Sequence, residues 1–130
     1  MPGMNSMSPL RTCSKNPRYF TNDAGKTVYL TGSHTWASFQ DMGLEGDKKI
    51  NYDEFLDMLE SHHHNFTRMW QWGHPLMAPW TEDRVYFEPM PYKRTGPGAA
   101  ADGKPRFNLD QWNEAYFDRL RSRFLEEGKR

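Results

Sequence analysis

Aromatic and basic side chains alternate along one short stretch of this 130-residue sequence. In NFTRMWQW, single residues separate Phe66, Arg68, Trp70 and Trp72. Since successive side chains of a β-strand point to opposite faces, these four would share one face. A guanidinium group can hydrogen-bond oxygen atoms while indole rings beside it stack on apolar surface. The spacing therefore indicates a strand with one face suited to a ligand.

A second group of the same kind lies earlier in the chain. SHTW follows the β-prone run TVYLTG and contributes a histidine and a tryptophan. If the two strands are parallel neighbours, their carboxyl ends meet at the edge where binding sites form in α/β proteins. Indole faces stack on the C–H surfaces of sugars, while Arg and His hydrogen-bond hydroxyl or carboxylate groups. We therefore predict a carbohydrate-binding surface made of His34, Trp36, Arg68, Trp70 and Trp72, with ordinary packing of these rings in a core as the alternative.

Two other patterns look like metal sites but lack the geometry for one. His62, His63 and His64 are contiguous, so they point in three directions at a helix end. Metal ligands need i, i+3 or i, i+4 spacing on a helix, or i, i+2 spacing on a strand. GLEGDKKINYDEF ends like a calcium loop, but it places Gly43 at the first ligand and Lys48 at the turn that requires glycine. We therefore expect no metal and no cofactor.

Local signals predict the elements that would position these residues. Two β-prone runs flank NDAG, whose residues favour a tight turn. Asn51 with Glu54 forms a capping box before an apolar stripe, and Asn108 with Gln111 forms another. The predicted elements are a hairpin of 18–21 with 27–31, a helix over 51–62, a strand over 66–70, a long loop over 73–107 and a helix over 108–128.

The order of these elements predicts an α/β fold. Strands that alternate with helices imply a parallel sheet with right-handed crossovers. Two such βα units do not close a sheet, because each strand of a parallel sheet is buried on both faces and needs neighbours. Residues 1–16, rich in Ser, Pro, Asn and Met, are expected to be a flexible lead-in. Residues 17–130 are expected to be part of a larger α/β protein.

Composition argues against several classes of partner. Lys plus Arg and Asp plus Glu both number 17, so we expect neither nucleic acid nor an anionic membrane as a partner. No apolar run approaches the roughly 18 residues that a membrane span needs. The first twenty residues contain no apolar stretch typical of a secretory signal, and the cellular location is left open. Cys13 is the single cysteine and cannot form an internal disulfide.

Three segments together resemble the start of bacterial cellulase-like and apiosidase-like glycoside hydrolases, which are retaining (β/α)8 barrels. These segments are NPRYFTNDAGKTVYLTGSHTWASFQD, HNFTRMWQW and PMPYKRTGPGAAADGKPRFNLDQWNEAYFDRLRSR, and the resemblance covers residues 16–130. It implies the N-terminal fragment of a TIM barrel, with a hairpin and the first two βα units. It also implies that Arg68 holds the nucleophile carboxylate of the family. The sugar subsites would be lined by His34, Trp36, Trp70 and Trp72, and the long loop would form one wall of the cleft.

The two catalytic carboxylates of that family have no counterpart in this sequence. In the family they follow the fourth and seventh barrel strands, and retaining hydrolysis needs two carboxyl groups about 5–5.5 Å apart. The resemblance thus implies a fragment that supplies one wall of a sugar cleft, with no catalytic residue and negligible glycosidase activity of its own. The alternative is a non-catalytic carbohydrate-binding or interaction module. Such a module would have to fold alone, which open sheet edges disfavour, because unpaired strand edges invite the self-association expected of a fragment.

Overall fold

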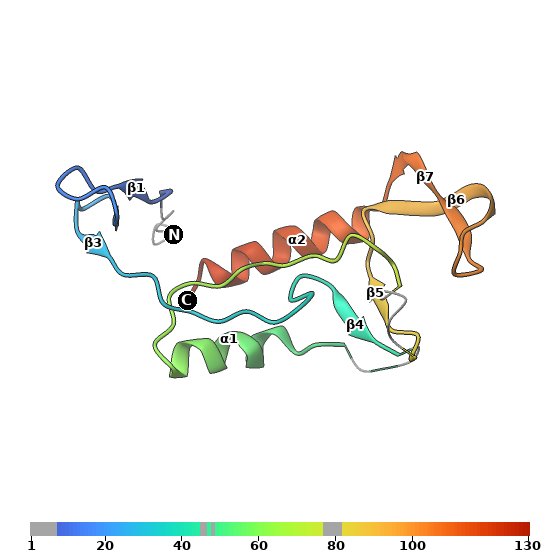
Figure 1. Ribbon diagram of the computed structural model, residues 1–130, viewed down its shortest axis with the longest axis horizontal. Coiled ribbons are helices and arrows are strands. Elements are labelled where there is room, and N and C mark those ends of the chain that lie inside the picture. The colour runs from blue at the N-terminus through green and yellow to red at the C-terminus, as the bar shows by residue number, and fades with distance from the viewer. Residues whose placement is uncertain (1–7, 45–46, 48, 77–81) are drawn as a thin grey trace, which may run out of the picture.

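The computed structural model describes residues 8–44, 47, 49–76 and 82–130, which form three small sheets and two helices (Figure 1). The helices are α1 (Tyr52–Ser61) and α2 (Glu114–Glu127), and the strands are β1 (Arg11–Thr12), β2 (Phe20–Thr21), β3 (Thr27–Val28), β4 (Asp41–Gly43), β5 (Tyr86–Glu88), β6 (Tyr92–Ala99) and β7 (Pro105–Trp112). One sheet has the order β1-β2-β3, and the others are the pairs β4-β5 and β6-β7.

The prediction of an α/β fold, with a hairpin and the first two βα units of a TIM barrel, is wrong. Every sheet among the described residues is antiparallel, so the fold is α+β. The two segments predicted as parallel neighbours meet in a single parallel bridge, Gly32 with Phe66. Beyond this bridge they are joined mostly by side chains, so no ladder of backbone hydrogen bonds develops. Alternating rings thus mark an extended segment here, not a sheet strand.

The segment predicted as a long loop, 73–107, contains β5, β6 and the beginning of β7. Its glycines and prolines led to the loop prediction, but the β6–β7 ribbon accommodates them. A Cβ at Gly96 would lie 2.9 Å from the carbonyl oxygen of Arg106, so glycine permits the close approach of the two strands. Pro97 lacks a backbone N–H, which a two-stranded ribbon with open outer edges tolerates. Residues 77–81 lie outside the described residues.

Both predicted helices form, but α2 begins at Glu114 instead of near residue 108. Residues 108–112 belong to β7, and the Asn108 side chain accepts a hydrogen bond from the backbone N–H of Asp110 (3.0 Å). Pairing with β6 therefore overrides the predicted capping box. The cap of α1 is confirmed, because the Asn51 side chain accepts from the N–H of Glu54 (3.4 Å).

The hairpin predicted over 18–21 and 27–31 is confirmed in a shorter form, as β2 and β3. Its turn closes through a hydrogen bond from the N–H of Gly25 to the carbonyl of Asn22 (2.9 Å). Gly25 has a φ of 71°, a conformation that glycine adopts readily. The lead-in predicted to be flexible over 1–16 instead contributes β1, which pairs with β2. Residues 1–7 lie outside the described residues.

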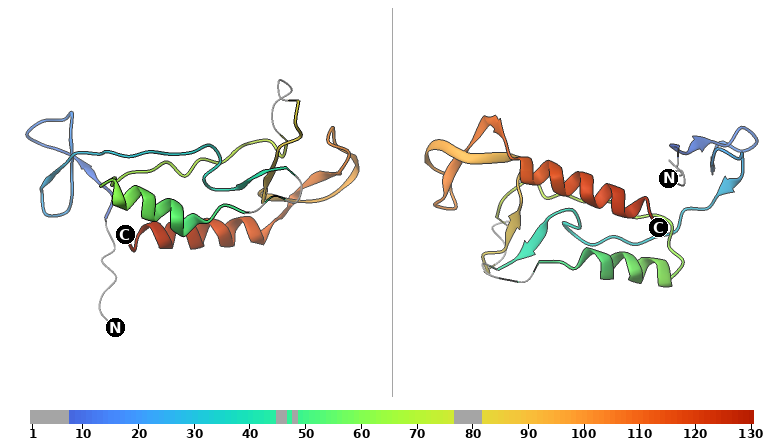
Figure 2. Two further views of the ribbon diagram at one scale, coloured as in Figure 1. Left: turned by 90° about the horizontal axis from the view of Figure 1, so that it is seen from below. Right: turned by 180° about the vertical axis from the view of Figure 1, so that it is seen from behind.

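The two helices lie side by side, and the extended segments 33–40 and 66–72 run along one side of the pair (Figure 2). Leu56 and Leu59 are the buried side chains of α1. The ring of Tyr116, from α2, meets Phe39 edge to face with centroids 4.7 Å apart. These buried contacts form a small core between the helix pair and the first extended segment.

Polar contacts also join the C-terminal half of α2 to α1. The hydroxyl of Tyr52 donates to the carboxylate of Glu127, and the guanidinium of Arg130 pairs with Asp57. Burial raises the pKa of the Tyr52 phenol well above its ordinary value of 10.0, and the hydrogen bond to Glu127 and its negative charge raise it further. Burial raises the pKa of Tyr116 as well.

These raised pKa values predict a loss of stability in alkaline solution. Above a pH of about 10 the unfolded chain ionises its tyrosines while folded Tyr52 keeps its proton, so the free energy of unfolding falls as pH rises. The variant Tyr52→Phe should lose less stability between about pH 9 and pH 11 than the unchanged protein does. Urea unfolding across this range measures the difference. Tyr116 remains in the variant, so the slope should shrink without vanishing, and equal slopes in both proteins would contradict the assignment.

The β6–β7 ribbon pairs with no further strand in the part of the chain that the structure describes, so its outer edges are open. Apolar side chains of the ribbon itself are also exposed, among them Leu109 and Trp112 of β7. Self-association through such edges stays a prediction. Neither helix within the described residues has the length and apolar character needed to cross a membrane.

Candidate functional site

Rings from three segments form one continuous row, which we call the aromatic ladder: His34, Trp36, Trp70, Trp72 and Phe87. Trp70 contacts both His34 (5.4 Å between ring centroids) and Trp36 (6.0 Å). Trp36 stacks on Trp72 with centroids 5.4 Å apart and planes inclined by 22°. Trp72 stacks in turn on Phe87 (5.3 Å, 17°), which is fully buried in β5. The ladder therefore runs from the buried core to the surface.

Exposure increases along the ladder away from Phe87. Trp70 and Trp72 are partly buried, whereas His34 is exposed and Trp36 keeps 48% of its surface accessible. Arg68 is also exposed, and its guanidinium carbon lies 4.5 Å from the centroid of the Trp70 ring. The accessible end thus combines one open indole, one imidazole and one guanidinium, which can serve stacking and hydrogen bonding at once.

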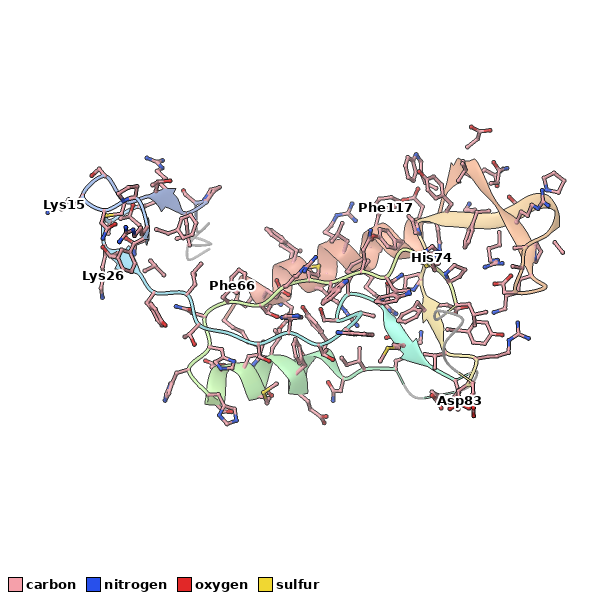
Figure 3. All side chains as sticks on the ribbon, in the orientation of Figure 1. Lys15, Lys26, Phe66, His74, Asp83 and Phe117 are labelled. Carbon is pink, nitrogen blue, oxygen red and sulfur yellow. The ribbon has the colours of Figure 1, made fainter. Side chains whose placement is uncertain are left out.

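Backbone contacts align the two segments that carry the ladder. The N–H of Asn65 donates to the carbonyl of Thr31 (2.9 Å), and the side-chain oxygen of Asn65 accepts from the N–H of Thr31 (2.9 Å). The side-chain amide of Asn65 also donates to the carbonyl of Tyr29 (3.0 Å). Figure 3 shows the next residue, Phe66, at one end of the second segment and His74 at the other. Asn65 therefore sets the register in which the rings meet.

Two buried polar side chains, Ser38 and Gln40, hold the segments together further along; each is 1% exposed. The hydroxyl of Ser38 donates to the carbonyl of Arg68 (3.0 Å) and accepts from the N–H of Trp70 (3.1 Å). The side-chain oxygen of Gln40 accepts from the N–H of Trp72 (2.6 Å), and its amide donates to the carbonyl of Pro89 (3.1 Å). These bonds replace the missing strand ladder and satisfy backbone groups that would otherwise be buried unpaired.

Ser38, Gln40 and Phe87 contribute to the site although the sequence pattern did not predict this. A signal for the first two exists, since they occupy alternate positions in WASFQD and so share one side of an extended chain. The sequence shows that Ser38 and Gln40 can form hydrogen bonds. It does not show with which residues, because their partners lie 30 or more residues away. Phe87 sits in the segment predicted as loop, which gave no reason to place it against Trp72.

A tight turn directs Trp36 out of the segment that carries it. Ala37 is buried and has a φ of 52°, a left-handed conformation that is uncommon for residues other than glycine. The N–H of Gln40 closes the turn on the carbonyl of Ala37 (2.9 Å). A non-glycine residue in this region costs free energy that the surrounding contacts must offset. The turn therefore ties the exposed indole to the buried clamp formed by Ser38 and Gln40.

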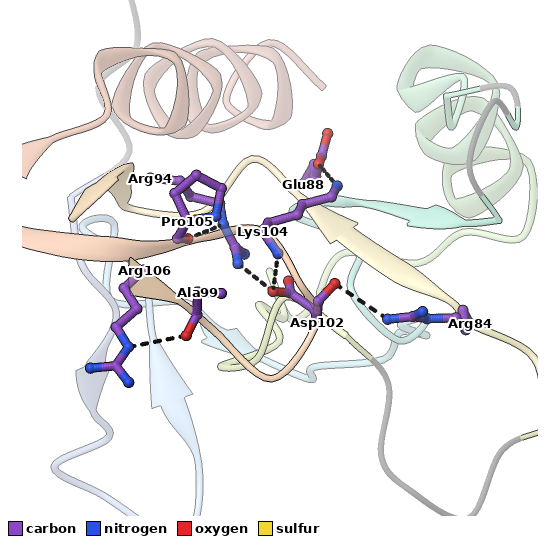
Figure 4. A network of polar contacts seen from close by, with 8 residues as sticks. All are labelled: Arg84, Glu88, Arg94, Ala99, Asp102, Lys104, Pro105 and Arg106. Atoms are coloured by element: carbon purple, nitrogen blue, oxygen red, sulfur yellow. Dashed lines mark hydrogen bonds and ion pairs between the residues drawn. The ribbon is translucent and has the colours of Figure 1, made fainter. Parts of the chain in front are cut away.

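A pocket of about 700 Å³ is lined by residues of β4, β5, β6, β7 and the start of α2; its lining includes Phe87, at the buried end of the ladder, but none of the three ladder indoles. A polar network crosses its wall (Figure 4). The Asp102 carboxylate accepts from Arg94 (2.6 Å) and from the N–H of Lys104 (3.2 Å). Burial raises the pKa of Asp102, but the Lys104 N–H and the Arg94 guanidinium outweigh it and leave the pKa lowered. The network ties the tip of the β6–β7 ribbon to its base.

The contiguous histidines lie at the end of α1, as the sequence predicts. The rings of His62 and His64 have centroids 6.2 Å apart, and His63 has a left-handed φ of 58°. Among the described residues, no group of three or more His, Cys, Asp or Glu side chains could hold a metal ion.

The structure brings together all five side chains that the sequence singled out: His34, Trp36, Arg68, Trp70 and Trp72. Their function in sugar binding stays a prediction. Trp36 is 48% exposed and so does not pack in a core, whereas Trp70 and Trp72 are partly buried. The resemblance to glycoside hydrolases rests on sequence segments alone, since no protein-family model, curated protein or solved structure matches this chain significantly.

Proposed function

We propose that the accessible end of the aromatic ladder binds carbohydrate and forms one wall of a glycoside hydrolase's sugar cleft. The observation that carries this proposal is the position of Trp36, half exposed and backed by Trp72 in parallel stacking. A backed indole is a rigid platform, so little conformational entropy is lost when a sugar ring stacks on its open face. His34 and Arg68 lie beside the same Trp70 ring and supply polar groups for hydroxyls.

The charge pattern supports a sugar ligand over nucleic acid. Binding to a phosphate backbone requires several cations along one groove. The accessible end of the ladder carries one guanidinium, Arg68, and the chain has as many acidic as basic residues. Aromatic stacking with few polar partners is instead the pattern of a sugar subsite.

The second candidate is a non-catalytic carbohydrate-binding module. One observation favours it: no Asp or Glu of the described residues forms a hydrogen bond or ion pair with Trp36, Arg68 or Trp70. Retaining hydrolysis needs a pair of carboxyl groups across the scissile bond. Both candidates use the same surface, and they differ in whether carboxylates from elsewhere complete it.

Removal of the exposed indole should abolish most sugar binding. Titration with cellotetraose should quench tryptophan fluorescence, and Trp36→Ala should weaken binding by about tenfold, since a ring contact of about 1.5 kcal/mol corresponds to that factor. Isothermal titration calorimetry gives the affinities independently of fluorescence.

Trp112→Ala is the matched control. Trp112 is 53% exposed, close to the value for Trp36, but it stacks on Tyr92 of the β6–β7 ribbon outside the ladder. Its removal should leave the affinity unchanged. An equal loss in both variants, or no binding of any oligosaccharide, neutral or acidic, by the unchanged protein, would overturn the proposed function.

A further inference from the structure

Arg68 is one of three arginines, with Arg11 and Arg18, whose guanidinium has no hydrogen-bonding partner among the described residues, and it is the one of the three that lies over an aromatic ring. Every arginine from residue 84 onward donates from its guanidinium to an oxygen atom of the protein: Arg84, Arg94, Arg106, Arg119, Arg121, Arg123 and Arg130. The guanidinium of Arg68 makes no hydrogen bond or ion pair with any residue that the structure describes, and its carbon lies 4.5 Å from the centroid of the Trp70 ring. Its hydrogen-bonding capacity is therefore unused.

Stacking on Trp70 leaves the N–H donors of the Arg68 guanidinium free to bind a ligand. The five N–H groups of a guanidinium lie in its plane, whereas the attraction to an indole acts through its flat face. The Trp70 ring, 4.5 Å away, therefore holds the Arg68 charge in place without consuming its donors. An ordered guanidinium with free edge donors is suited to a planar carboxylate, which it can bind through two parallel hydrogen bonds.

The location of the Arg68 guanidinium on the same indole as Trp36, the ring proposed to stack on sugar, indicates the chemical class of the ligand. Arg68 and Trp36 both contact the same indole, Trp70, at 4.5 Å and 6.0 Å from its ring centroid, so both groups border one part of the ladder surface. His34 contacts Trp70 as well and adds a second polar group. We propose that the ligand is an acidic glycan and that Arg68 binds the carboxylate of a uronic acid residue stacked at Trp36. This inference rests on the proposed function and adds a substrate class to it.

The experiment compares two oligosaccharides that differ only at C6 of each sugar residue. Cellotetraose and its C6-oxidised counterpart, a tetramer of β-1,4-linked glucuronate, share the same rings and linkage. We expect the oxidised tetramer to bind about tenfold more tightly in low salt, because hydrogen bonds to charged groups exceed neutral ones by about that factor. The preference should shrink as ionic strength rises.

Three variants assign the preference to Arg68. Arg68→Gln should remove it and leave cellotetraose binding in place, while Arg68→Lys should retain part of it as a point charge without the planar fork. Arg11→Gln removes an equal charge from β1, a strand that pairs only with β2, and should change nothing. Thermal unfolding of each variant shows that the fold is intact.

The possible results distinguish a failure of the acidic-glycan proposal from a failure of the proposed sugar-binding function. Equal affinity for the two tetramers, or a preference that survives in Arg68→Gln, overturns the acidic ligand while the sugar-binding function stands. Binding of neither tetramer overturns both. A preference abolished by Arg68→Gln and untouched by Arg11→Gln supports the inference.

Discussion

Gly32→Ala should separate the two segments that carry the aromatic ladder. A Cβ at this position would lie 1.6 Å from the carbonyl oxygen of Phe66 and 2.6 Å from its carbonyl carbon, and both are backbone atoms. Since no side-chain rotation relieves such a clash, the backbone must move apart, at a cost on the order of 3 kcal/mol. The bridge between Gly32 and Phe66 and the neighbouring bonds between Thr31 and Asn65 would then be lost.

Two measurements report this change independently. Urea unfolding gives the loss of stability, and tryptophan fluorescence reports whether the ring contacts of Trp36 and Trp70 persist. Gly73→Ala is the control, because Gly73 has a negative φ and no atom within 4 Å of the position of its Cβ. It lies directly after Trp72, so it tests the effect of an added methyl group near the ladder. Stability in Gly32→Ala equal to that of Gly73→Ala would show that the two segments do not approach as closely as the structure has them.

Four of the five ladder rings and Arg68 could be predicted from sequence, although Phe87 and the fold that positions them could not. The sequence places Trp36 and Trp70 side by side if the two segments that carry them are parallel neighbours, and the two rings do lie side by side. The reason, however, is different from the one expected. A parallel sheet would have joined the segments by backbone hydrogen bonds, whereas the buried side chains of Ser38 and Gln40 do so here.

Long-range pairing accounts for the larger errors. The capping signal at Asn108 is local, but β6 lies alongside this residue in a paired ribbon, and tertiary context overrides local preference. A period of two predicted a strand over 66–70, yet that period describes any extended chain and does not require sheet partners. Helix α1 was placed correctly because its cap and its apolar stripe, Leu56 and Leu59, are both local signals.

Arg123, the buried cation of α2, should contribute a large part of the free energy that holds α1 and α2 together. Arg123 is 7% exposed, and its guanidinium donates to the carbonyl of Ser38, lies 3.8 Å from the carboxylate of Asp41 and covers the ring of Tyr52 at 4.3 Å. Burial lowers the pKa of this guanidinium, and the nearby Arg119 lowers it further, while Asp41 raises it. Arg123 thus joins α2 to α1 and to the first segment of the ladder at one point.

Arg123→Met removes the charge and the donors while it preserves much of the side-chain volume. We expect a loss of about 3 kcal/mol in the free energy of unfolding, because the Ser38 carbonyl is left unpaired and Asp41 loses one of its two cations. Arg121→Met is the matched control on the same helix. Arg121 pairs only with Asp118, and both side chains are largely exposed, so its removal should cost less than about 1 kcal/mol.

The losses of unfolding free energy in Arg123→Met and Arg121→Met should differ because the cost depends on how deeply the guanidinium is buried, while both substitutions remove the same charge. Water screens the Arg121 pair and replaces its partner when it is removed, whereas water does not reach the Ser38 carbonyl or the face of Tyr52 beneath Arg123. Arg123→Lys should fall between them, since it keeps the charge without the planar group that covers Tyr52. Urea unfolding of the three variants gives the order, and equal losses in Arg123→Met and Arg121→Met would mean that α2 does not dock on the ladder segment through this residue.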